Sequence, residues 1–370
     1  MLYRVWNFVR RHKKKIVFGA IFLIGGRYFY HYIGKKLKDF QNKEAAECLE
    51  YARRQHHFDN NQRTCNMTVL SMLPTLRERL RALLNTEEIT ENLKSSPADK
   101  VQLWEDLKIL SLTRVITVVY ACTMMCLMLR VQLNIIGGYM FVENVKKHQG
   151  MSANAAMHVA PTPVQEKYLA LIREFFDKGV VSLVSKVKEA VYKETSSLTL
   201  KEKLSLHNLE AIIKHIRERV ENGQEVSIKE ISTLPLSELL VCWKTSDEDK
   251  EPSDDLYCQL LKETQDILYS HDFHTVFSTA LDRGFAKLVD YLAEFYQPLQ
   301  KTETSVIQLH DVSVPLAKLI PFLSGLLYKL GSDAPNPLVQ ELLLLEQTKT
   351  LAANIYEAFS QIEETDDPQP

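Results

Sequence analysis

A long stretch of this 370-residue chain contains no glycine. None lies between Gly34 and Gly137, and only Pro74 and Pro97 interrupt that stretch. Hairpin-rich sheets need many tight turns, and tight turns depend on glycine, proline and short polar residues. The sequence therefore predicts an all-α fold, an elongated bundle of long helices. One N-terminal membrane anchor is expected before this bundle, for reasons that lie in the first forty residues.

Composition narrows the class of protein. Hydrophobic residues make up 45% of the chain, so a sizeable core can form, and the formal net charge is only −2. Such a balance provides no global field that attracts nucleic acid. The six cysteines show no CxxC pair, and scattered thiols in a chain of this size indicate a reducing compartment.

The first forty residues have the pattern of a membrane anchor. A basic block precedes an apolar run, and an aromatic stretch with further lysines follows it. Residues 16–34 as one helix would span about 28 Å, close to the roughly 30 Å of a bilayer's hydrocarbon core. We therefore expect residues 1–40 to form the anchor, with the span at about 16–34 and a membrane-targeting block of Arg10, Arg11, Lys13, Lys14 and Lys15.

A cleaved secretory signal peptide is the main alternative for this segment. It is disfavoured because no A-x-A-like cleavage site follows Ile24 and basic residues come next. The orientation is ambiguous. The positive-inside rule would leave the N-terminus in the cytosol and the rest of the chain on the opposite side of the membrane. The scattered, unpaired pattern of cysteines instead indicates that the bulk of the chain lies in the cytosol. We favour the second argument.

Residues 41–370 are expected to form one cytosolic helical bundle. Loops are expected at 144–165 and 222–255, and an acidic, disordered tail at 361–370. Apolar residues at helical spacing predict the helices, at residues 41–84, 86–93, from 96 onward, 168–192, 198–220, 256–271, 273–297, 312–330 and 336–360.

The most apolar stretch, residues 115–142, has two interpretations. It could be a second membrane span or the core helix of the bundle. The uncharged residues between Arg114 and Arg130 cover only about 22 Å of helix, which is more typical of a buried core helix. We favour the core helix.

The chain lacks the common signatures of catalysis and of cofactor binding. It has no P-loop, no G-x-G-x-x-G, no G-x-S-x-G and no H-E-x-x-H. Cys122 and Cys126 lie four residues apart in the most apolar stretch, where buried free thiols are the better interpretation. We expect no enzyme, no metal, no cofactor, no nucleic acid and no small-molecule substrate.

Trp104 is the candidate binding residue that the pattern singles out. Lys100 precedes it by four residues and Lys108 follows it by four, so a helix would align all three on one stripe. An exposed tryptophan between lysines suits a partner helix with apolar anchors and acidic neighbours. A core tryptophan beside solvated lysines explains the same pattern equally well.

Long sequence runs resemble the peroxisomal biogenesis factor 3 (peroxin-3) family, and the resemblance covers nearly the whole chain. The runs are residues 6–15, NQRTCNMTVLSMLPTLRE (61–78), WEDLK (104–108), LRVQLNIIGGY (129–139), SVPLAKLIP (313–321) and NIYEAF (354–359). The resemblance implies an anchor in the peroxisomal membrane lipid and a cytosolic bundle. It also implies docking of peroxisomal biogenesis factor 19, the receptor for newly made peroxisomal membrane proteins.

In that family an amphipathic helix of the receptor lies in a hydrophobic groove at one end of the bundle. The resemblance therefore implies a partner-binding site of Trp104, Leu107 and Lys108 from the WEDLK run, with Leu93, Lys94 and Lys100 shortly before it. Asn134 and Gly138 are expected to support the groove. Two other functions stay open: a membrane-anchored enzyme with an unrecognised site, and a general organelle tether with a broad charged surface.

Overall fold

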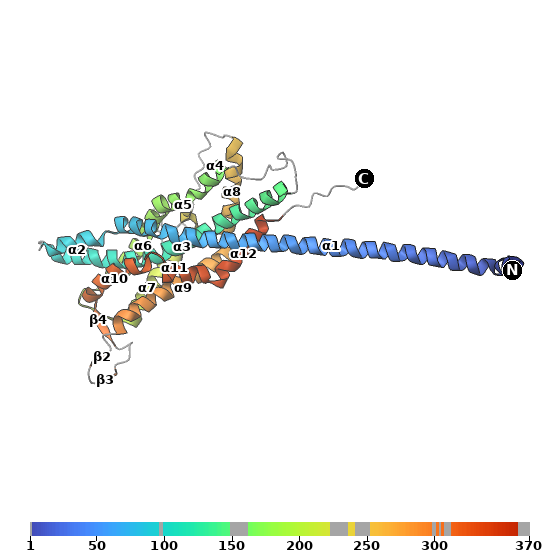
Figure 1. Ribbon diagram of the computed structural model, residues 1–370. Coiled ribbons are helices and arrows are strands. Elements are labelled where there is room, and N and C mark those ends of the chain that lie inside the picture. Colours follow the sequence, from blue (N-terminus) through green and yellow to red (C-terminus); the bar gives the residue numbers. More distant parts are fainter. Residues whose placement is uncertain are drawn as a thin grey trace. The chain divides into compact units, whose positions relative to one another are not determined.

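The computed structural model describes residues 2–95, 99–148, 162–222, 236–240, 252–297, 301–302, 305–306 and 312–361. The side chains of residues 2–30, 34, 148, 222, 237, 252–254, 301–302 and 305–306 lie outside this description. The α-helices, labelled in Figure 1, are α1 (Leu2–Leu83), α2 (Thr86–Lys94), α3 (Lys100–His148), α4 (Thr162–Leu169), α5 (Leu171–Glu174), α6 (Val180–Thr195), α7 (Leu206–Asn222), α8 (Pro252–Leu268), α9 (His271–Tyr296), α10 (Leu316–Leu330), α11 (Pro337–Leu344) and α12 (Glu346–Phe359).

The strands are short and form two separate antiparallel pairs. β1 (Lys203–Ser205) pairs with β4 (Ser313–Pro315), and β2 (Lys301–Thr302) pairs with β3 (Ser305–Val306). Everything else with regular structure in the described residues is helical. The prediction of an all-α fold is confirmed.

The chain divides by its contacts into two units, residues 1–59 and residues 60–370. In the first unit, α1 includes the expected span 16–34. The side chains of the span up to residue 30 and of the basic block lie outside the described part. The membrane anchor and the targeting function of the block therefore stay predictions.

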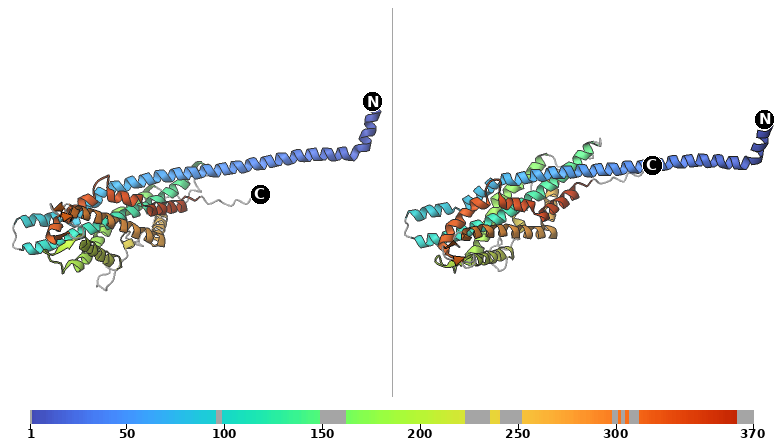
Figure 2. Two further views of the ribbon diagram at one scale, coloured as in Figure 1. Left: turned by 90° about the horizontal axis from the view of Figure 1, so that it is seen from below. Right: turned by 60° about the horizontal axis from the view of Figure 1, so that its bottom comes forward.

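In the second unit, α3 is the central helix of the core. It contacts α6, α9, α10 and α12, and Figures 1 and 2 show these helices around it. α3 is apolar on every side over its middle, and a helix of that kind must be enclosed. Among the residues whose side chains are described, which exclude 2–30 of α1, α3 is the one helix long and apolar enough to cross a membrane. Its most apolar window is completely buried inside the structure. The structure thus favours the core-helix interpretation of residues 115–142.

The two arginines that bracket this apolar stretch are also buried. Arg114 is 0% exposed and Arg130 is 2% exposed. Arg130 donates hydrogen bonds to the Asn66 side chain (2.6 Å), to the Leu343 carbonyl oxygen (3.3 Å) and to the Gln62 side chain. A buried guanidinium is tolerated only where acceptors satisfy it, so Arg130 ties residues 60–83 of α1 and the end of α11 to the middle of α3.

Several predicted helices differ from the observed ones; the helix expected at 336–360, for example, divides into α11 and α12 at Leu345. The helix expected at 168–192 is interrupted by a π-helical turn, Phe175–Gly179. A Cβ at Gly179 would lie 2.2 Å from the Leu239 carbonyl oxygen, so the backbone of the 3-10 helix Leu236–Leu239 sits directly on this turn. The helices expected at 198–220 and 312–330 begin only at Leu206 and Leu316, because the residues before them form the β1–β4 pair.

The expected loops are shorter than predicted. α3 continues to His148 and α4 begins at Thr162, while residues 149–161 lie outside the described part. Within 222–255, a 3-10 helix forms at Leu236–Leu239 and α8 begins at Pro252. Most of the expected tail, residues 362–370, also lies outside the described residues.

Candidate functional site

A groove lies where α2, the start of α3 and the middle of α10 meet. Figures 1 and 2 both show these three elements together at one end of the second unit. The groove encloses about 750 Å³. Its lining comprises Glu87, Thr90, Glu91, Leu93 and Lys94 of α2, Lys100, Trp104 and Leu107 of α3, and Pro321, Ser324, Gly325 and Tyr328 of α10.

Trp104 combines the two roles that its sequence pattern allowed. Its side chain is partly buried and packs against the hydrophobic core, and the same residue lines the groove. Leu107, one turn further along α3, is only 3% exposed, and Leu93 is partly buried against the same core. Together these residues give the groove an apolar floor that is anchored in the core.

Gly325 leaves room in the opposite wall. A Cβ placed at this residue would meet no atom within 4 Å, so the position faces open space. Tyr328, one turn later on α10, is 46% exposed and also lines the groove. The α10 wall therefore has both an accessible aromatic side chain and a gap beside it.

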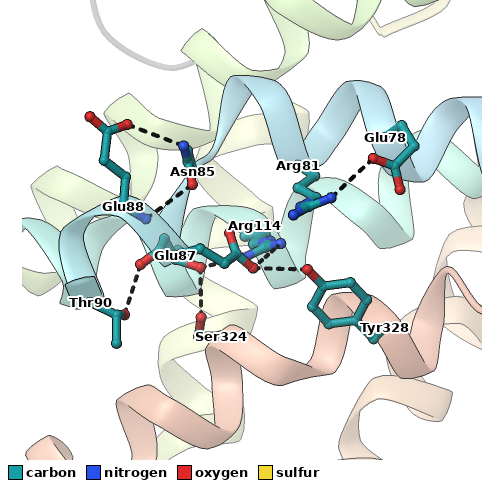
Figure 3. Close-up of polar contacts among 10 residues, drawn as sticks. Glu78, Arg81, Asn85, Glu87, Glu88, Thr90, Arg114, Ser324 and Tyr328 are labelled. Carbon is teal, nitrogen blue, oxygen red and sulfur yellow. Dashed lines mark hydrogen bonds and ion pairs between the residues drawn. The ribbon is translucent and has the colours of Figure 1, made fainter.

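α2 begins with a side-chain cap. The Asn85 side chain accepts a hydrogen bond from the Glu88 amide (3.1 Å) and donates one to the Glu88 carboxylate (3.1 Å), as Figure 3 shows. The first of these bonds satisfies a backbone amide that the first helical turn leaves unpaired. The cap explains why a helix of only nine residues starts sharply after α1.

Behind α2 lies an ion pair between Glu87 and the buried Arg114 of α3. Both terminal nitrogens of Arg114 donate to Glu87 Oε1 at 2.9 Å, and the Tyr328 hydroxyl donates to the same oxygen at 3.0 Å (Figure 3). Burial by itself would raise the pKa of Glu87. The hydrogen bonds and charge of Arg114 outweigh burial, so the pKa of Glu87 lies below its ordinary value. Glu87 is therefore a carboxylate at neutral pH.

The predicted lysines divide into two kinds. Lys94 and Lys100 are exposed at the groove, and Lys94 pairs with Glu91 at 3.2 Å. Lys108 is only 1% exposed and donates hydrogen bonds to the carbonyl oxygens of Thr195 (3.1 Å) and Leu198 (2.9 Å). The prediction of a surface stripe is therefore wrong for Lys108, whose charge is held inside the bundle.

Asn134 and Gly138 lie too far along α3 to support the groove directly. They are about thirty residues beyond Trp104, which corresponds to roughly 45 Å of helix. The Asn134 side chain accepts hydrogen bonds from Asn61 (3.1 Å) and Gln62 (2.7 Å) of α1. Gly138 packs against Phe359 of α12. Their expected place at the groove is corrected: they join α3 to other helices.

Sequence reasoning missed the wall that α10 contributes. Pro321 ends the SVPLAKLIP run, but nothing in that run indicates that it faces Trp104 more than two hundred residues earlier. It also missed Glu87, Thr90 and Glu91. A usable signal was Gly325, a glycine in the interior of an otherwise strongly helical segment, which often has a packing or functional reason.

The described residues contain no group of three or more histidine, cysteine, aspartate or glutamate side chains that could hold a metal ion. Cys122 and Cys126 are buried, as predicted. Burial raises the pKa of the Cys122 thiol to about 12. Burial also raises the pKa of the Cys65 thiol to about 11, against the opposing charge of Arg130. Thiols that stay protonated are poor nucleophiles, so these cysteines belong to the packed core.

Known proteins match this chain over nearly its whole length. The sequence model of the Peroxin-3 family matches residues 7–100 and 94–358. The chain belongs to the peroxin-3 family. Human peroxisomal biogenesis factor 3 is 44% identical over 375 residues, covering 97% of this chain and 98% of the human protein. The bovine protein of the same name is also 44% identical, with the same coverage.

More distant relatives retain the full length. Peroxisome biogenesis protein 3-1 of Arabidopsis thaliana is 24% identical, over 94% of this chain and 96% of the plant protein. As a member of this family, the chain has a role in peroxisome biogenesis and is associated with the peroxisome. A biogenesis factor points to a non-enzymatic protein, in agreement with the sequence analysis.

Proposed function

We propose that this chain is a membrane-anchored docking factor for peroxisomal biogenesis factor 19, the cytosolic receptor of newly made peroxisomal membrane proteins. Residues 1–40 anchor it in the peroxisomal membrane, and the helical bundle faces the cytosol. An amphipathic helix of the receptor binds in the groove of α2, α3 and α10. Docking delivers membrane proteins to the peroxisome and thereby serves membrane assembly.

The groove around Trp104 is the observation that carries this proposal. Amphipathic helices bind in grooves that present an apolar floor to their apolar face. Trp104, Leu93 and Leu107 supply such a floor, while exposed Lys94 and Lys100 supply a polar rim. A partly buried tryptophan that lines a concave surface is typical of a binding hot spot.

The test is the affinity of the full-length chain, in detergent or nanodiscs, for a synthetic peptide of the receptor's N-terminal amphipathic helix. Trp104→Ala should weaken binding by about 2 kcal/mol or more, roughly thirtyfold at about 1.4 kcal/mol per tenfold. A melting curve of the same variant measures its fold separately. Because Trp104 also packs on the core, we expect some loss of melting temperature but a folded protein at the assay temperature.

Two further variants separate the groove from general effects. Gly325→Leu should fill open space in the groove and block the peptide without harming the fold, because glycine inside a helix is itself unfavourable by about 1 kcal/mol. Tyr192→Ala removes an aromatic side chain that is 59% exposed on α6, away from the groove lining, and should leave binding unchanged. Equal affinity of wild type and Gly325→Leu would overturn the proposal.

A further inference from the structure

α2 forms one wall of the groove, yet apolar packing holds it only weakly. Within α2, all of which the structure describes, Thr86 is the only buried residue. Ile89 and Leu93 are partly buried against the core. A helix with so little buried apolar surface has a low free energy of local opening unless other interactions hold it.

The interactions that hold α2 are polar and meet at Arg114. Its guanidinium is 0% exposed and donates to Glu87 and to the Thr86 hydroxyl of α2. It also lies over the Tyr328 ring of α10, with 5.6 Å to the ring centre. Figure 3 shows the Arg114, Glu87 and Tyr328 side chains directed toward one another between the three helices.

A second link runs from α2 to α10. The hydroxyls of Thr86 and Ser324 are hydrogen-bonded at 2.7 Å, and Tyr328 donates to Glu87 Oε1 at 3.0 Å. One carboxylate oxygen of Glu87 therefore connects the α2 wall to the core helix and to the opposite wall. Since Arg114 cannot lose its proton in a protein, and an unpaired buried charge is strongly unfavourable, Arg114 holds Glu87 in place.

We propose that Glu87, Arg114 and Tyr328 are positioning residues for partner binding: a polar clamp that keeps α2 at the distance from α10 that an open groove requires. This inference rests on the proposed docking function of the groove. When the clamp loosens, only a fraction of molecules has a binding-competent groove. The apparent dissociation constant then rises by the inverse of that fraction.

Tyr328→Phe is the sharpest test, because it removes one hydroxyl and keeps the ring that lines the groove. Two quantities are measured on the full-length chain: affinity for the synthetic receptor peptide, and hydrogen exchange of the α2 backbone amides in the absence of peptide. A hydrogen bond to a charged group shifts the opening equilibrium of α2 by about tenfold, so the affinity should fall by up to the same factor. Exchange of the α2 amides should accelerate, while the amides of α9 should exchange as in wild type.

A matched control removes a tyrosine hydroxyl from α6, and a second variant tests the other link between α2 and α10. Tyr192→Phe removes a hydroxyl from an exposed tyrosine on α6 and should change neither quantity. Ser324→Ala removes the second link between α2 and α10 and should accelerate α2 exchange by itself. In the double variant Tyr328→Phe/Ser324→Ala, the loss of affinity should exceed that of either single variant, because both links hold the same helix.

Two other outcomes for Tyr328→Phe would each overturn the clamp. Lost affinity with unchanged α2 exchange would mean that the Tyr328 hydroxyl contacts the peptide directly. Faster α2 exchange with unchanged affinity would mean that the position of α2 does not control the groove. Failure of the wild-type chain to bind the peptide would refute the docking function alone. Unaltered α2 exchange in both Tyr328→Phe and Ser324→Ala would refute the clamp, whether or not the peptide binds.

Discussion

Arg114 shows how one side chain can couple a core to a binding surface. It sits at the boundary of the most apolar stretch of the sequence and is completely buried, a position that arginine occupies only with strong partners. Its partners come from the short helix α2, so the requirement to satisfy a buried charge fixes a wall of the groove. The charge of Glu87 is therefore structural as well as part of the groove lining.

The pH dependence of stability follows from Glu87. Because the pKa of Glu87 is lower in the folded chain than its ordinary value of 4.5, its ionised form stabilises the fold. This contribution is present above the ordinary pKa and disappears as the pH falls through the lowered, folded-state pKa. The difference in free energy of unfolding between wild type and Glu87→Gln should therefore be constant near neutral pH and shrink in acid.

Urea denaturation of both proteins from neutral pH down to about pH 3 measures that difference. Subtracting the free energy of unfolding of Glu87→Gln from that of wild type at each pH removes the acid sensitivity that the two proteins have in common. A difference that stays constant throughout the acid range would show that Glu87 does not ionise differently in the folded state.

At the scale of elements, two glycines in helix interiors serve opposite purposes. A Cβ at Gly138 of α3 would lie 2.6 Å from the Phe359 Cβ and 2.7 Å from the Phe359 carbonyl carbon, whereas Gly325 of α10 faces open space. The first glycine allows α3 and α12 to approach closely. The second leaves the groove open.

The same substitution at both positions should therefore have opposite effects on stability. Gly138→Ala should destabilise the chain by about 1–3 kcal/mol, because backbone atoms of α12 cannot move aside easily. Gly325→Ala should stabilise it by up to about 1 kcal/mol through helix propensity alone. Chemical denaturation of the two variants beside wild type measures both, and equal effects would contradict the close approach of α3 and α12.

For the whole molecule, the basic block and the apolar run that follows predict an autonomous targeting segment. Residues 1–40 fused to a fluorescent reporter should direct it to peroxisomes as an uncleaved membrane protein, recovered in the membrane fraction after alkaline washing. Replacing Arg10, Arg11, Lys13, Lys14 and Lys15 with glutamine should abolish peroxisomal targeting. Replacing Lys35, Lys36 and Lys38 in the same way removes three positive charges on the other side of the apolar run. It is the positional control, for which targeting should persist.

Fluorescence microscopy and the length of the recovered fusion report the outcome. A diffuse reporter, or one shortened by cleavage after the apolar run, would contradict the anchor and favour the signal-peptide alternative. The helical bundle is not part of this fusion, so the result is independent of the docking groove.

The class of fold and the position of the central helix could be predicted from the residues alone. A hundred residues with no glycine favour helices, and the short uncharged stretch between Arg114 and Arg130 favours a core helix over a membrane span for residues 115–142. The sequence also indicated Trp104, since the WEDLK run carries the family resemblance. Each of these conclusions depends on local spacing or composition, which the linear sequence records directly.

Tertiary structure alone decided which helices meet and what each polar side chain contacts. The groove needs Tyr328 beside Glu87, residues separated by 241 positions in the sequence. Lys108 has the same spacing from Trp104 as Lys100 has, but the carbonyl oxygens of Thr195 and Leu198 hold it inside the bundle. Helical periodicity places residues on a common face, but it does not specify what packs against that face, because contacts between distant segments depend on the fold of the whole unit.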